Sequence, residues 1–124
     1  MNRYFFYLIF IFIVSAIYSC KNDNTVEILK YSVLKEYPHD ASSFTQGLVW
    51  ENGQLYEGTG LEGKSKLLNV DLATGKINKA VDLGAEYFGE GICILKDKIY
   101  QLTWQNRKVF VYDKSTFNLL QTFS

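Results

Sequence analysis

Gln46-Gly47-Leu48 and Glu90-Gly91-Ile92 stand 44 residues apart and open two segments of the chain that resemble each other. The other matched positions keep their order: Leu55-Tyr56 with Ile99-Tyr100, Thr59 with Thr103 and, after a two-residue shift, Val70-Asp71 with Tyr112-Asp113. An internal period of this length is typical of proteins that are built from repeated supersecondary units. The sequence therefore predicts two copies of a unit of about 43 residues.

Turn signals divide each unit into four short strands. Asn52-Gly53, for example, supplies the positive φ that a tight hairpin turn requires. The expected strands span residues 45–50, 54–57, 66–72 and 77–83 in the first unit, and 91–95, 98–103, 108–112 and 119–123 in the second. No stretch after residue 24 shows a helical period over three turns, so the fold is expected to be all-β.

Four strands in each unit of about 43 residues are typical of a β-propeller blade, which predicts blades at 44–83 and 90–123. An eight-stranded β-sandwich is the alternative, but the ordered likeness of the two units favours the propeller. A propeller has at least four blades, so the 124 residues are expected to be part of one, a fragment or a truncated product. An extra strand at residues 31–36 is expected to complete the last blade, within a partial propeller at 31–124.

The first 20 residues are expected to be a secretory signal outside the fold. Arg3 gives a positive start, an apolar run from Tyr4 to Ile17 follows, and Ser19-Cys20 ends it. The segment resembles a bacterial lipoprotein signal, which would make Cys20 the lipid attachment site. The run is short for a bilayer span of roughly 20 residues, although an uncleaved anchor is the alternative. Residues 21–30 then form a polar tether, and the domain lies outside the cytoplasm on a membrane.

Composition and residue spacing argue against two other classes of protein. The formal net charge is zero, whereas nucleic-acid binding needs a basic surplus, so nucleic acid is not expected as a partner. No His, Cys and Asp cluster has metal-ligand spacing, so neither a metal nor another cofactor is expected. Cys93 lies in the apolar run from Ile92 to Leu95 and is expected to be a buried, inert strand thiol.

Four residues should meet at one mouth of the propeller channel, because first strands line the channel and second strands run antiparallel to them. Gln46 and Glu90 begin first strands, and Thr59 and Trp104 follow second strands. Glu90 is the candidate acid–base, since its flanking glycines let other backbone approach and its aromatic neighbours can exclude water. A solvent-facing turn glutamate is the alternative.

For each of the other candidates, a binding role and an ordinary structural role are alternatives. Trp104 could stack on a small planar group or fill a blade interface. Gln46 could orient a substrate amide or hold backbone groups in the channel. His39 fits a turn or a blade contact better than a base.

Five segments in order resemble the glutamine cyclotransferase family of plants and bacteria. They are 37–40 (YPHD), 44–48 (FTQGL), 55–61 (LYEGTGL), 87–91 (YFGEG) and 101–104 (QLTW). The resemblance implies a five-bladed propeller that converts an N-terminal glutamine of a peptide or protein into pyroglutamate and releases ammonia. It also implies that Glu90 is the catalytic acid–base and that Gln46 and Trp104 lie in the substrate pocket, where Thr59 is expected to join them. A non-catalytic peptide-binding propeller, or an inactive remnant, is the alternative.

Overall fold

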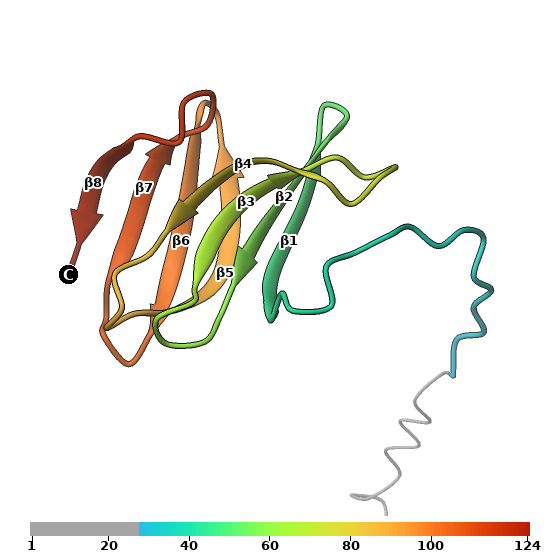
Figure 1. The fold of residues 1–124 in the computed structure, drawn as a ribbon, viewed down its shortest axis with the longest axis horizontal. Coiled ribbons are helices and arrows are strands. Elements are labelled where there is room, and N and C mark those ends of the chain that lie inside the picture. Colours follow the sequence, from blue (N-terminus) through green and yellow to red (C-terminus); the bar gives the residue numbers. More distant parts are fainter. Residues whose placement is uncertain (1–27) are drawn as a thin grey trace, which may run out of the picture. The chain divides into compact units, whose positions relative to one another are not determined.

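The computed structural model describes residues 28–124, of which residues 34–124 belong to one compact unit. That unit contains two four-stranded antiparallel sheets, in which each strand pairs with its neighbours in the sequence (Figure 1). The first sheet consists of β1 (Thr45–Glu51), β2 (Gln54–Thr59), β3 (Lys66–Val70) and β4 (Ile77–Asp82). The second consists of β5 (Phe88–Leu95), β6 (Lys98–Trp104), β7 (Val109–Asp113) and β8 (Leu119–Phe123). All eight strands predicted after residue 44 are confirmed, with boundaries that differ by up to three residues.

The turns between the third and fourth strands show the repeat at the level of single hydrogen bonds. In the first sheet, Asp71 Oδ1 accepts bonds from the amide and the hydroxyl of Thr74, at 2.8 and 2.7 Å. In the second, Asp113 Oδ1 accepts the matching bonds from Thr116, at 2.8 and 2.9 Å. A short side chain that caps its own turn in this way stabilises the bend, and both turns have it.

The main core lies between the two sheets, because each strand places alternate side chains on opposite faces. Its buried members are Tyr56, Leu67, Leu83, Ile99, Phe110, Tyr112 and Phe117. Burial raises the pKa of Tyr112 to about 12, since the phenolate would lose its hydration. A second cluster of Leu55, Leu68 and Val70 lies on the opposite face of the first sheet.

Glycines let the two sheets approach each other closely where β5 lies against β1 and β2. A Cβ on Gly47 would stand 2.5 Å from the backbone nitrogen of Ile92, and one on Gly89 would stand 2.5 Å from the carbonyl oxygen of Thr59. Both distances are shorter than any van der Waals contact, so a side chain at either position would push the sheets apart.

One expectation is wrong and one stays a prediction. Residues 31–36 form no strand among the described residues, but their expected partner is the last blade of the propeller, which these residues do not include. Cys93 was expected to be buried and is exposed. It alternates along β5 with Ile92 and Ile94, which pack against the main core, so it faces away from the first sheet.

The predicted signal at 1–20 and most of the predicted tether at 21–30 lie outside the described residues. Between residues 28 and 124 no helix is long and apolar enough to cross a membrane.

Candidate functional site at one end of the two sheets

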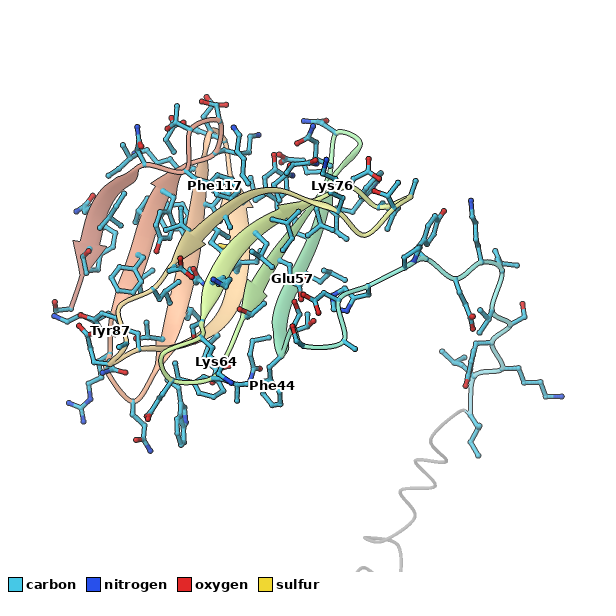
Figure 2. All side chains as sticks on the ribbon, viewed as in Figure 1. Phe44, Glu57, Lys64, Lys76, Tyr87 and Phe117 are labelled. Atoms are coloured by element: carbon cyan, nitrogen blue, oxygen red, sulfur yellow. The ribbon has the colours of Figure 1, made fainter. Side chains whose placement is uncertain are left out.

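The starts of the first strands and the ends of the second strands share one end of the sheets, as predicted. Thr45 pairs with Thr59 at the start of β1, and Phe88 pairs with Trp104 at the start of β5. Figure 1 shows both starts at the lower end of the view. The hairpin turns and the Asp71 and Asp113 turns lie at the opposite end, and Figure 2 places Phe44 far from Phe117 accordingly.

Gln46 and Glu90 both lie at β-bulges. The register of β1 jumps between Thr45 and Gly47, which leaves Gln46 as the extra residue against β2. The register of β5 jumps between Gly89 and Ile92, which sets Glu90 and Gly91 against one residue of β6. A bulge re-aims a side chain that regular pleating would direct elsewhere, and bulges are frequent beside active sites. The two candidates are therefore set by the same backbone irregularity in matched positions.

The two bulges lie side by side. A Cβ on Gly91 would stand 4.0 Å from the carbonyl oxygen of Gln46, and one on Gly47 would stand 3.0 Å from the Cα of Gly91. Glu90 is half-buried, and its carbonyl oxygen lies against Gly58 of β2. The structure thus brings the backbones of Gln46 and Glu90 together from adjacent sheets.

Three aromatic rings form a row beside the bulges. The rings of Phe44 and Phe88 meet edge to face with centroids 6.1 Å apart, and those of Phe88 and Trp104 meet in the same way at 5.7 Å. Trp104 is 52% exposed, so part of its ring is free to stack against a ligand. We call Phe44, Phe88 and Trp104 the aromatic row.

Gln46 joins the aromatic row through Gly60. A Cβ on Gly60 would stand 2.5 Å from the Phe88 ring and 3.1 Å from Cγ of Gln46, so both side chains close over this glycine. The roles of Phe44 and Phe88 were missed in the sequence. A signal was available, because these two phenylalanines stand 44 residues apart, at the spacing of the repeat.

Thr59 is buried, and its hydroxyl is already bonded within the fold. Its Oγ1 accepts a hydrogen bond from the Lys66 amide at 2.8 Å, across the loop between β2 and β3. Thr103 makes the matching bond with the Lys108 amide at 3.0 Å in the second sheet. The Thr59 hydroxyl therefore stabilises the loop between β2 and β3. Its contact with a substrate remains a prediction.

Glu57 was missed, and it is the most buried carboxylate that the structure describes, with 1% of its surface exposed. Its Oε1 accepts a hydrogen bond of 2.5 Å from the Thr45 hydroxyl, and both of its oxygens lie 3.1 Å from Nε2 of His39. The sole histidine is therefore a contact residue, as predicted, and its partner is this carboxylate. The pairing of Glu57 with Gln101 at the repeat spacing could have marked both positions as buried and polar.

A hollow of about 330 Å³ lies beside this end of the first sheet and reaches from Phe44 and Thr59 to Leu68 and Ile77. Gln46, Glu90 and Trp104 do not line it, but Phe44 of the aromatic row and Thr59 do, so the hollow borders the candidate site. Within residues 28–124, no three His, Cys, Asp or Glu side chains stand close enough together to hold a metal ion.

The arrangement can bind and orient a small polar group. A half-buried carboxylate can accept and return a proton, a carboxamide can both donate and accept hydrogen bonds, and ring faces can cover the ligand. The carboxylate, the carboxamide and the aromatic rings lie at one end of the sheets because the two matched bulges and the aromatic row are all located there.

Three kinds of comparison with known proteins agree. A family model described as glutamine cyclotransferase matches residues 7–124. The glutaminyl-peptide cyclotransferase of Arabidopsis thaliana is 38% identical over 102 residues, which are 82% of this chain and 32% of the plant protein. The crystal structure of Myxococcus xanthus glutaminyl cyclase matches with a TM-score of 0.66 and 29% identity, over 75% of this chain and 40% of that one. The chain spans about a third of the length of the curated relative that it matches.

Proposed function

Because this chain belongs to the glutamine cyclotransferase family, we propose that the protein is a glutaminyl-peptide cyclotransferase. Its substrate would be a peptide or protein with an N-terminal glutamine. The α-amine attacks the carbon of the γ-amide, the new C–N bond closes the pyroglutamate ring, and the old C–N bond breaks to release ammonia. The observation that carries the proposal is the convergence of Glu90, Gln46 and the aromatic row.

Glu90 is the acid–base of this reaction. Its carboxylate takes a proton from the attacking amine and gives it to the departing ammonia, so one group serves both halves of the transfer. General acid–base catalysis of this kind contributes on the order of 10²–10⁴ in rate. The bulge at Glu90 supports this role because it fixes the direction of the side chain.

Gln46 and the aromatic row orient the substrate. The carboxamide of Gln46 can donate to and accept from the amide that is attacked, while Trp104 and Phe88 cover the substrate chain. The attacking group is part of the substrate, so holding it near its target contributes most, up to roughly 7–11 kcal/mol in favourable cases. Thr59 supports the mouth by holding the loop after β2.

The two sheets are the first two blades of a five-bladed propeller. Their chain-order topology and the likeness to glutaminyl cyclase support this reading. The chain spans about a third of its curated relative, so further blades and pocket residues would come from beyond the 124 residues.

The protein is anchored outside the cytoplasm by lipid on Cys20. The apolar run that ends in Ser19-Cys20 supports this proposal. Cys20→Ser should move the protein from the membrane fraction to the soluble one, and an unchanged membrane fraction would contradict lipidation.

The test of the enzyme uses the protein of the complete reading frame that contains this chain. Glu90→Gln is expected to lower kcat for a Gln-initiated dipeptide by about 10²–10⁴-fold, measured as ammonia release. Glu86→Gln is the matched control, because Glu86 is exposed four residues earlier, and it should leave turnover unchanged. Unchanged turnover in Glu90→Gln would remove the assignment. Peptide binding without ammonia in the wild type would favour the non-catalytic propeller.

A further inference from the structure

The hydrogen bond between Thr45 and Glu57 spans the bulge that carries Gln46. Thr45 pairs with Thr59 on one side of the bulge, and Glu57 pairs with Leu48 on the other. The bond of 2.5 Å therefore joins the residue before the bulge to the partner strand beyond it. A bulge breaks the ladder where the extra residue stands, so a side-chain bond across it restores a constraint that the backbone has lost.

Glu57 is held in place from its other side. It is 1% exposed, and a buried carboxylate must be hydrogen-bonded to remain stable. Nε2 of His39 lies 3.1 Å from both of its oxygens, and His39 is 42% exposed. Figure 2 shows the Glu57 carboxylate directed toward the segment that leads into β1. The carboxylate is thus fixed between the start of β1 and this segment.

We propose that Glu57 and Thr45 are positioning residues for the site, which set the direction of Gln46 by bracing its bulge. This proposal rests on the proposed function, because Gln46 is taken to orient the substrate amide. Neither residue touches the substrate in this account. Thr45 acts through the backbone of the next residue, and Glu57 acts through Thr45.

The test is a double-mutant cycle in the protein of the complete reading frame. Thr45→Val keeps the shape of the side chain but removes its hydroxyl. It is expected to raise KM for a Gln-initiated dipeptide by about 10- to 100-fold and to lower kcat as well, because Gln46 is proposed to bind the amide and to hold it in the reacting geometry. In the background of Gln46→Ala, the same change should have no further effect on KM, since residues that act as one unit are not additive. Thr45→Ser, which keeps the hydroxyl, should restore the wild-type KM.

Glu57→Gln gives a second measurement if Thr45→Val does not fold. The carboxamide oxygen can still accept the Thr45 hydrogen bond, so KM should stay within about threefold of the wild type. A wild-type KM in Thr45→Val, or effects of Thr45→Val and Gln46→Ala that multiply, would overturn the positioning role.

The proposed function itself is tested separately, by ammonia release from the wild-type protein. If the wild type releases no ammonia, the enzyme assignment fails, and the same cycle is run on peptide affinity by calorimetry. Weaker binding in Thr45→Val alone, absent in the Gln46→Ala background, would still support the brace. Unchanged binding, or no binding by the wild type, would overturn it.

Discussion

The two bulges at the candidate site are matched in the repeat but braced from different places. The first, at Gln46, is spanned by the Thr45–Glu57 bond within its own sheet. The second lies next to Gly89, which matches Thr45 but has no side chain, and the Gly89 amide donates instead to Ser65 Oγ, in the loop between β2 and β3, at 2.9 Å. Side chains of the first repeat unit therefore make hydrogen bonds at both bulges.

The turns after β3 and β7 show a similar division. Both keep the same aspartate hydrogen bonds, and both need a residue with positive φ, which is Gly75 with φ 70° in one and Phe117 with φ 64° in the other. A Cβ on Gly75 would stand 2.8 Å from the carbonyl oxygen of Pro38, whereas Phe117 is buried in the core between the sheets. The two turns thus share their aspartate hydrogen bonds. They differ at the residue with positive φ, which contacts Pro38 in the first turn and the core between the sheets in the second.

The largest expected effect is at Phe117, where a ring in the main core is held on a backbone conformation that favours glycine. Phe117→Ala should destabilise the protein by about 3–5 kcal/mol, because it leaves a cavity in that core. Phe117→Gly should be about 1 kcal/mol more stable than Phe117→Ala, since glycine accepts positive φ without strain. Thermal and denaturant unfolding of both variants would measure this, and the reverse order would show that φ is not a constraint here.

A smaller effect is expected at the matched polar positions Glu57 and Gln101. His39→Ala removes a partner of the buried Glu57 carboxylate and should cost about 1–3 kcal/mol. Gln101→Leu should change stability by less than about 1 kcal/mol. The side chain of Gln101 makes one bond of 3.2 Å to the Lys66 carbonyl, and its Oε1 has no partner among the described residues. If His39→Ala and Gln101→Leu lowered the denaturation midpoint equally, Glu57 would not be more important for stability than Gln101.

The smallest expected effect concerns the aspartate hydrogen bonds that the Asp71 and Asp113 turns share. Hydrogen bonds from Ser115 and then from Thr116 lower the pKa of Asp113 to about 2 in the folded protein. A lowered folded pKa gives stability that is present above the unfolded pKa of about 3.8 and is lost as pH falls toward 2. Asp113→Asn should therefore lower the melting temperature at pH 6 and have less effect near pH 2.

Asp71→Asn is the matched variant for this measurement. The pKa of Asp71 is also lowered, by hydrogen bonds from Thr74. In both variants the loss of melting temperature should be larger at pH 6 than near pH 2. If the loss in one variant did not depend on pH, the aspartate of that turn would not contribute in the same way as the other.

Much of the fold could be predicted because short strands in a repeat are marked by local signals. Asn52-Gly53 marks a hairpin, and the Asp71 and Asp113 turns recur at fixed spacing. The strand at 31–36 could not be judged in this way, since a strand also depends on a partner that the segment does not contain. Cys93 was placed wrongly because an apolar run does not say which face of its sheet is covered.

The sequence predicted that the candidate residues meet at one end of the sheets, but it did not predict their local geometry. Gln46 and Glu90 follow from the order of strands in each repeat. The bulges depend on strand register, which a single sequence does not fix. Glu57 was missed because a glutamate between a tyrosine and a glycine gives no sign that a histidine 18 residues earlier covers it.

The exposed thiol of Cys93 offers a chemical reporter of one face of the second sheet, the face turned away from the first sheet. In the proposed propeller a following blade would pack on that face. With Cys20 replaced by serine, maleimide should alkylate Cys93 rapidly in the isolated 124-residue polypeptide and slowly in the product of the complete reading frame. The labelling rate would then show, without any substrate, whether that face is covered.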